Sequence, residues 1–499
     1  MNQIKLGAVL SYFSLGVSNI IVLSYTPFML RMLGQAEYGL YSLVFSVVSA
    51  LVLLDCGFGP ALVRYIVKYK AAKQYDEIAG LIGMFAIIYT VIGFVCLLLG
   101  IVLYTNIDFI FKQSMEAEEI QKAKYMVAII AIYISLNFLF SIFSSVIVAY
   151  ERFVFLKLTQ ILRSLLMPAL MIPLLFLGYK SVAMAVTLVM VGVIIWVINA
   201  VYCIRKLKLS VKFVRFDFLL LKEILLFSGL AFMKILLERF FWSTGQFIEG
   251  AIAGTIAVAL LSIALQMNGY YQVFANAING LFLPRMIAMA HNKVDGKEFS
   301  DYFIRISRLQ MHFLGLIMCI YLLFGKDFIL LWAGKDYEVS YYLSLIIMIP
   351  YAIPLTQNLG KTLLEACNKQ KYHVIVLSVS CASMILLSLL WGKKYPVYGI
   401  AIAIGVSIVL SEVLLLNFFY KKKMHLDIGG YYKELLKMIF LMGCPTVAFF
   451  YFMPSFLIKN YMDLLKYLLL FLSIYIFFVP LMLNRYERNL LLSFVKRRL

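Results

Sequence analysis

The chain has 499 residues, of which 64% are hydrophobic and only 14% are charged, and its mean hydropathy is +0.94. A soluble domain has about 45–50% apolar and about 25% charged residues, so an ordinary globular enzyme is excluded, and the 40 Phe and 33 Tyr exclude a disordered chain. The net charge of +20 suggests a nucleic-acid partner, but the placement of the basic residues argues against one.

Apolar runs of about 20 residues, the length at which a helix spans a bilayer, recur along the whole chain. Fourteen spans are predicted: 6–30, 39–63, 78–104, 125–149, 159–177, 182–203, 224–247, 256–283, 309–332, 341–365, 374–392, 398–420, 438–456 and 464–484. The first run is too long for a signal-peptide core and no small-residue cleavage pattern follows it, so we expect an uncleaved first span. The predicted fold class is an all-α polytopic membrane protein.

The basic residues predict the orientation of these spans. Thirty of the 45 Lys and Arg residues fall in the segments that are cytoplasmic if both termini are cytoplasmic. Because basic loops resist translocation, this excess indicates a multi-pass protein with both termini inside. The positive charge then reports topology, and the partner expected at the inner face is anionic lipid and no nucleic acid.

A weak internal repeat predicts the domain organisation. Phe58-Gly59-Pro60 closes the second span and Phe282-Leu283-Pro284 closes the eighth, and a basic loop follows each. We expect an N-terminal six-helix bundle (1–203), a cytoplasmic linker (204–223), a second six-helix bundle (224–420), and two extra helices with a basic tail (421–499). Six is even, so a pseudo-two-fold axis along the membrane normal would relate the bundles. Proline is common at span ends, which is the alternative explanation.

Charged residues inside a bilayer are costly and usually face a protein interior or an aqueous cavity. Span 7 carries Lys234, Glu238 and Arg239, and Lys234 lies about 15 Å from the start of the span, near the middle of the membrane. One interpretation is a cationic patch in a central cavity. The other is a structural ion-pair network that ties span 7 to its neighbours.

Other charges and prolines within spans have simpler explanations. Arg163 lies near a span end, where a long side chain can reach the interface. Lys361 and Glu365 are four residues apart and could neutralise each other. Pro350 and Pro354 in span 10 permit bending, as do the prolines of span 5.

Two spans carry polar residues at steps of three or four, which places them on one helix face. The lumen-lining candidates are Tyr133, Asn137 and Ser141 in span 4 and Asn268, Gln272, Asn276 and Asn279 in span 8. Polar side chains also join helices inside membranes. Four amides on one face exceed what packing usually needs, so a polar lumen is favoured for span 8.

The sequence offers no catalytic machinery. No aqueous loop is long enough for catalysis, and there is no Asp-x-Asp, no Walker-type Gly-x-x-x-x-Gly-Lys and no serine elbow. The seven cysteines stand singly in apolar surroundings and the four histidines are scattered, so we expect neither disulfides nor a metal centre. A secondary-type transporter without a cofactor is predicted, and an enzyme is not.

Three segments resemble a known family. RMLGQAEYGLY (31–41) is similar to the R-x-L-G-x-x-E-Y-G-x-Y signature that opens many polysaccharide flippases of the O-antigen, or Wzx, type. FGKDFILLWAGKDY (324–337) resembles their F-G-x-x-F-I-x-L-W-x-G-x-x-Y stretch, and DCGFGPALVRY from Asp55 fits the end of their second span. These flippases belong to the multidrug/oligosaccharidyl-lipid/polysaccharide exporter superfamily, whose fourteen-span layout covers the whole chain.

The resemblance implies a flippase of the bacterial cytoplasmic membrane. Such a protein moves oligosaccharide repeat units linked to polyprenyl (undecaprenyl) diphosphate from the inner to the outer leaflet by alternating access, for O-antigen, capsule or exopolysaccharide assembly. It implies a V-shaped central cavity with a cationic lumen for the diphosphate. Arg31 and Arg64 match basic residues beside that cavity by position. Further diphosphate-binding candidates are Lys234, Arg239 and Arg163, which are basic residues within predicted spans.

This function is chemically coherent with the residues present. Guanidinium groups bind diphosphate in a bidentate manner, and hydroxyls and amides can serve the glycan. A proton or sodium ion could be coupled through a carboxylate that titrates inside the protein. The coupling candidates are Asp55, Glu238, Glu249 and Glu412. Two alternatives stay open: a cation-coupled multidrug exporter of the same superfamily, and a non-transporting scaffold that binds other glycan-assembly proteins.

Overall fold

The computed structural model describes residues 3–55, 57–212, 218–291, 296–367, 369–453, 457–484 and 486–488, and every regular element among them is a helix. Twelve helical runs in this part of the chain are long and apolar enough to cross a membrane. Two of them, Phe13–Ala71 and Phe232–Ala277, each cover two predicted spans, so the fourteen predicted spans coincide with helices. Helices are expected here because hydrocarbon offers the backbone no hydrogen-bond partner.

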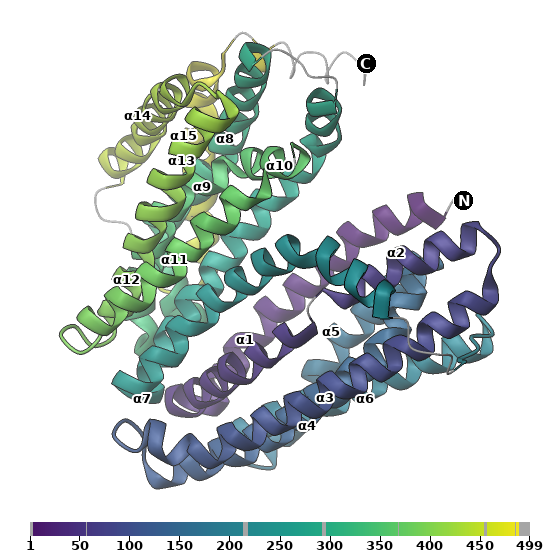
Figure 1. Cartoon of the computed structure of the whole chain (residues 1–499). Coiled ribbons are helices and arrows are strands. Elements are labelled where there is room, and N and C mark those ends of the chain that lie inside the picture. Colours follow the sequence, from purple (N-terminus) through teal and green to yellow (C-terminus); the bar gives the residue numbers. More distant parts are fainter. Residues whose placement is uncertain are drawn as a thin grey trace. The chain divides into compact units, whose positions relative to one another are not determined.

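The chain forms two compact units, and the first comprises residues 1–262 and 381–403. It contains α1 (Gln3–Ser49), the 3₁₀ turn η1 (Ala50–Asp55), α2 (Phe58–Ala71), α3 (Tyr75–Phe111), α4 (Ala117–Ala149), α5 (Phe153–Phe176), α6 (Lys180–Arg205) and the first part of α7 (Phe218–His291). Helices α3 and α4 pack side by side along their lengths (Figure 1). Leu62, Phe85 and Ile130 are fully buried in the core of this unit.

The second unit comprises residues 263–380 and 404–499. Besides the rest of α7 it contains α8 (Gly296–Trp332), η2 (Lys335–Tyr337), α9 (Glu338–Thr356), α10 (Asn358–Ala366), the π-helical segment η3 (Val409–Leu415), α13 (Leu416–Met424), α14 (Ile428–Phe452) and α15 (Tyr461–Met482). Helices α11 (Gln370–Trp391) and α12 (Tyr398–Ile408) contribute to both units. Aromatic side chains, among them Phe303, Tyr431 and Phe449, fill the core.

Two glycines break long helices at corresponding places. Helix α1 is interrupted at Gly34 (φ 75°, ψ 171°) and α7 at Gly254 (φ 80°, ψ −172°), a conformation that glycine adopts far more readily than other residues. The breaks separate the first and second spans and the seventh and eighth spans, six spans apart. This correspondence supports the internal repeat. The pseudo-two-fold axis and the predicted bundle boundaries stay predictions.

Prolines affect two helices differently. Helix α9 ends two residues after Pro354, and the chain leaves helical geometry at Gln357 before α10 begins. Helix α5, in contrast, runs without a break through Pro168 and Pro173. The bend allowed by the sequence is therefore realised in span 10, where it sets α10 off from α9.

Candidate functional site

Polar side chains join α7, α9 and α10 inside the second unit. Gln272 donates from Nε2 to the hydroxyl of Tyr351 at 2.9 Å, and Asn358 donates from Nδ2 to Oδ1 of Asn276 at 3.1 Å. Asn276 is exposed, whereas Asn358 is buried. Two of the four amides predicted on one face of span 8 are thus connected to the break between α9 and α10.

The other two amides of span 8 are more enclosed. Asn268 is 2% exposed and donates to the backbone oxygens of Ala264 at 2.9 Å and Ser344 at 3.4 Å, so it joins α7 to α9. Asn279 is half-buried. The side-chain oxygens of Asn268 and Asn279 are buried and meet no donor among the described residues. Helix packing is therefore the observed role of Asn268.

A buried polar network surrounds the α9–α10 break. Gln357 is fully buried and donates to Oδ1 of Asn417 at 2.9 Å, and Asn417 in turn donates to the hydroxyl of Tyr432 at 2.9 Å. The hydroxyls of Thr356 and Tyr431 lie 2.7 Å apart. These contacts bring α13 and α14 to the break, so the polar interior of this unit draws on five helices.

An ion pair joins α10 to η3 in the same unit. Nζ of Lys361 on α10 is 2.5 Å from Oε2 of Glu412 in η3, and the two side chains are 16% and 9% exposed. From the sequence, Glu365 is a residue that could neutralise Lys361. The structure instead pairs Lys361 with a residue 51 positions away. Glu412, a coupling candidate, is thereby a paired carboxylate.

In the first unit, a coupling candidate and a lumen candidate meet through a tyrosine. Asp55 ends η1 and accepts a hydrogen bond of 2.9 Å from the hydroxyl of Tyr89 on α3, and the backbone N–H groups of Gly57 and Gly59 donate to it as well. Ser141 on α4 hydrogen-bonds to the same Tyr89 hydroxyl. Tyr89 could not be selected from the sequence, because a tyrosine in an apolar span resembles any membrane-facing aromatic residue.

The other polar residues of span 4 belong to an aromatic stack. The indole of Trp196 on α6 lies between Tyr133 and Phe140, with ring centroids 4.8 Å from each and nearly parallel planes. Its Nε1 donates to Oδ1 of Asn137 at 2.9 Å. Arg163 on α5 interacts electrostatically with Tyr133. The predicted residues Tyr133, Asn137 and Arg163 are thus brought together, around a tryptophan that is only 8% exposed.

Glu249 on α7 is the most deeply buried of the coupling candidates, at 1% exposure. Among the described residues no salt bridge reaches it. Its carboxylate oxygens accept no hydrogen bond of standard geometry there, although the backbone N–H of Val397 is within reach of a weaker one. A buried carboxyl group without a cation carries a large desolvation cost when it is charged.

The remaining candidates are distributed over several helices. Lys234 and Glu238 are half-buried on the first part of α7, and Arg239 beside them is exposed. Arg31 on α1, Arg64 on α2 and Arg163 on α5 are exposed as well. The five basic candidates for the diphosphate therefore lie on four helices of the first unit, and their role as a joint site stays a prediction.

The acidic residue of the RMLGQAEYGLY motif has a structural role that the sequence did not reveal. Glu37 accepts hydrogen bonds from Nζ of Lys122 at 2.6 Å and from the hydroxyl and backbone N–H of Ser181 at 2.5 and 3.2 Å. It therefore joins α1 to α4 and α6. Its partners are 85 and 144 residues away, so local spacing carries no sign of them.

The helical segments that follow the two glycine breaks meet in what we call the kink contact, formed by Gly39, Phe111, Glu119, Phe247 and Thr255. A Cβ atom at Gly39 would overlap the backbone oxygen of Thr255, so only glycine allows this approach. Thr255 donates from its hydroxyl to Oε1 of Glu119 at 2.8 Å, and the rings of Phe111 and Phe247 meet edge to face. The kink contact holds α1, α3, α4 and α7 together.

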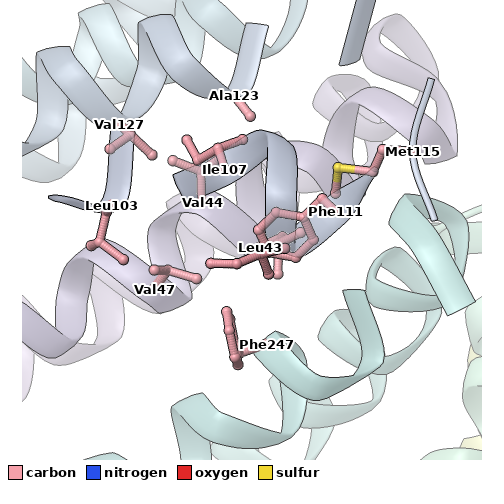
Figure 2. Close-up of a pocket in the computed structure, with 11 residues that line it drawn as sticks. Leu43, Val44, Val47, Leu103, Ile107, Phe111, Met115, Ala123, Val127 and Phe247 are labelled. Carbon is pink, nitrogen blue, oxygen red and sulfur yellow. The ribbon is translucent and has the colours of Figure 1, made fainter. Parts of the chain in front are cut away.

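Beside the kink contact lies a pocket whose eleven lining residues are all apolar (Figure 2). Side chains from α1, α3 and α4, among them Leu43, Ile107 and Val127, point toward one another, and Phe247 of α7 faces them. Hydrocarbon fits such a lining. A diphosphate does not, because the pocket offers it no ionic or hydrogen-bonding partner.

Arg308 on α8 anchors a second buried ion network. In the sequence, Arg308 is only one of the basic residues that indicate the orientation of the spans. Its Nε and one terminal nitrogen donate to the two carboxylate oxygens of Glu487 at 3.0 and 3.1 Å, and its other terminal nitrogen contacts Glu434 of α14. Nε2 of His312 lies 3.4 Å from Glu487. Burial alone would raise the pKa of Glu487, but the hydrogen bonds from His312, Arg308 and the backbone N–H of Asn484 outweigh it and lower the pKa to about 2.

Comparison with known proteins places this architecture. The model of a family described as "Polysaccharide biosynthesis protein" matches residues 7–290. A protein of Shigella flexneri described as "Putative O-antigen transporter" is 24% identical over 430 residues, which cover 85% of this chain and 98% of that protein.

Two solved structures share the fold. The lipid II flippase MurJ in an inward closed conformation has a TM-score of 0.74 and 16% identity, over 97% of this chain and 99% of MurJ. An inward-facing multidrug resistance MATE family transporter of the MOP superfamily has a TM-score of 0.64 and 13% identity, over 81% of this chain and 93% of that one. Because the family model covers more than half of the sequence, the chain belongs to the polysaccharide biosynthesis protein family, and its fold is that of MOP-superfamily transporters.

Proposed function

We propose that the protein is a flippase that moves oligosaccharide linked to polyprenyl diphosphate from the inner to the outer leaflet of a bacterial cytoplasmic membrane by alternating access. The observation that carries this proposal is the family match over residues 7–290, together with the O-antigen transporter relative, which aligns over 98% of its own length. The likeness to the lipid II flippase supports the fold that such transport needs.

The polar interiors of the two units support the same substrate class. A glycan diphosphate that crosses hydrocarbon must exchange its water for protein hydrogen bonds and ionic partners. The amides of α7 and α10 and the polar groups near Tyr89 are suited to hydroxyl-rich sugars. Basic residues, foremost Lys234 and Arg239 of α7, are proposed to hold the diphosphate, while the polyprenyl chain stays in lipid.

We assign ion coupling to Glu249 and take the ion to be a proton. A proton needs a single carboxylate, whereas a sodium ion needs several oxygen ligands around it. Among the described residues no group of three His, Cys, Asp or Glu side chains could hold a metal ion. Glu249→Gln should abolish the stimulation of transport by a pH gradient and leave transport without a gradient in place. Stimulation of the wild type by a sodium gradient alone would contradict the assignment.

The test of the flippase proposal is transbilayer movement of a short polyprenyl-diphosphate oligosaccharide in proteoliposomes, read as accessibility of the sugar to an impermeant modifying reagent. Movement above that of protein-free liposomes is the expected result, with a loss in Arg239→Ala. Equal movement in that variant would keep the flippase and remove Arg239 from the site. A folded wild type that moves no glycolipid would contradict the proposal.

A further inference from the structure

We propose that Lys361 is a substrate-binding cation, and that Glu412 occupies it until the diphosphate of the substrate takes the place of the carboxylate. This inference rests on the proposed function. It adds Lys361 to the proposed binding site, a residue whose charge could have been neutralised by its neighbour Glu365. It also gives the Lys361–Glu412 pair a role beyond holding η3 to α10.

Because both charged groups are buried, the pair contributes little net stability. Both side chains are largely buried, and Nζ of Lys361 is 2.5 Å from Oε2 of Glu412. Removing two charges from water costs about as much as their attraction returns, so apolar residues of the same volume usually serve packing equally well. Glu412 belongs to a helical run that is long and apolar enough to cross a membrane, where a charge usually serves a function.

The position of Lys361 connects it to the polar face of span 8. Asn358 and Lys361 are three residues apart on α10 and so lie on the same helix face. Asn358 bonds to Asn276, which is exposed. Lys361 therefore lies on the face of α10 that also carries the contact to Asn276, and it is the more exposed member of its pair.

Each partner lies in or next to an irregularity of its helix. Helix α10 begins after the break at Gln357, and Glu412 lies in the π-helical segment η3. Breaks and π-helical turns in membrane helices are common at functional sites, because a small rotation there changes which groups meet. We expect such a rotation to separate Nζ from the carboxylate.

Chemistry favours the exchange of partners. A diphosphate carries more negative charge than one carboxylate, and lysine binds phosphate as a compact point charge. Glu412 also has a second partner nearby. Tyr420 interacts electrostatically with Glu412, and its buried hydroxyl makes no hydrogen bond to the described residues. We expect this hydroxyl to donate to Glu412 when Lys361 turns to the substrate.

The experiment measures two quantities on the purified full-length protein: thermal stability in detergent, and binding of a short-chain polyprenyl diphosphate without sugar. The variants are Lys361→Met, Glu412→Gln and the double variant Lys361→Met/Glu412→Leu. Each single variant should lower the melting temperature, because it leaves one charge buried alone, and the double variant should recover it.

Binding separates the substrate role from a structural one. Lys361→Met and the double variant should both bind at least about tenfold more weakly, the usual loss for one charge-assisted contact. Glu412→Gln, which frees Lys361, should bind as well as the wild type or better. The control is the pair Lys326–Glu338, at 2.7 Å and half-exposed in the same unit. Lys326→Met/Glu338→Leu should change neither quantity.

Three results would overturn the inference. Full recovery of binding in the stable double variant would make the pair structural, as would an equal loss of binding in Glu412→Gln and Lys361→Met. Unchanged binding in Lys361→Met, with a wild type that binds, would remove Lys361 from the site and leave the proposed function intact. A wild type that binds no polyprenyl diphosphate would overturn the proposed function and this inference with it.

Discussion

Arg308 and Lys361 illustrate two ways in which this chain keeps a cation inside. The guanidinium of Arg308 is 3% exposed and has its hydrogen bonds satisfied by Glu487, Glu434 and the backbone oxygen of Met482. Among the described residues, the one carboxylate paired with Lys361 is that of Glu412. A fully satisfied pair fixes structure, whereas a cation with one carboxylate can exchange it.

The stability contributed by Glu487 depends on pH in a defined direction. Its pKa in the folded protein is about 2, below the ordinary value of about 4.3. A lowered pKa means that the contribution is fully present above the ordinary value and is lost as the pH falls through the folded value. The melting temperature of Glu487→Gln should therefore lie below that of the wild type by a constant amount above about pH 5, and the gap should narrow toward pH 2.

The measurement is thermal unfolding of both proteins in detergent across that range. Asp301→Asn is a suitable control, since Asp301 is an exposed carboxylate on α8. A gap that stays constant down to pH 2 would show that the Glu487 carboxylate does not contribute through its charge.

Glu249 and Glu412 should respond oppositely to the same substitution. Glu249 has no salt bridge among the described residues, so Glu249→Gln removes a desolvation cost and should leave the melting temperature equal or higher. Glu412→Gln leaves Lys361 buried without its carboxylate and should lower stability by about 3 kcal/mol or more. Chemical or thermal unfolding in detergent measures both. Destabilisation by Glu249→Gln equal to that by Glu412→Gln would reveal a partner for Glu249.

At the scale of helices, the glycine breaks of α1 and α7 determine how closely the first unit packs. Gly34 and Gly254 turn the chain, and Gly39 allows its helix to touch the backbone at Thr255. Hydropathy predicted the spans on either side of each break, because an apolar run of that length inside a bilayer must form a helix to satisfy its backbone hydrogen bonds. It did not predict the kink contact, because close approach depends on which backbone faces the glycine.

Gly39→Ala should therefore disrupt the kink contact. The added Cβ would overlap a backbone oxygen, which cannot move aside as the end of a side chain can, so we expect a loss of about 1–3 kcal/mol in stability. Gly269→Ala on α7 is the matched control. Its Cβ would meet nothing within 4 Å, and alanine favours a helix by up to about 1 kcal/mol over glycine. Equal unfolding of both variants would contradict the close approach at Gly39.

Irregular helical segments were the least predictable elements. The prolines of span 10 indicated a bend, and the helix does break after Pro354. Span 5 also has two prolines, but they do not break α5. The π-helical segment at Val409–Leu415 left no mark in the apolar pattern, because an extra residue in a turn alters register without altering composition. Glu412, a candidate functional residue, therefore lies in a segment whose irregular structure the apolar pattern does not predict.

For the molecule as a whole, the sequence was sufficient for the class, the spans and the family. The motif RMLGQAEYGLY predicted a relationship that the family match confirms. Individual side-chain partners were not predictable. The partners lie 85 residues away for Glu37, 51 for Lys361 and 179 for Arg308. The spacing of residues in a single sequence does not indicate contacts over such separations. The lumen candidates were chosen by helix face, and Asn276 and Ser141 do lie in polar clusters. Lys361 also shares a helix face with Glu365, but the carboxylate that pairs with it is Glu412, from another helix.

The proposed function assigns a lipid-linked diphosphate glycan as the cargo, and not a small organic cation. It is tested most directly by offering both cargoes to the same proteoliposomes: a polyprenyl-diphosphate oligosaccharide read by an impermeant sugar reagent, and a fluorescent organic cation read by uptake. We predict movement of the glycolipid, its loss in Lys361→Met, and cation uptake no greater than in protein-free liposomes. Uptake of the cation with no movement of the glycolipid would contradict the account.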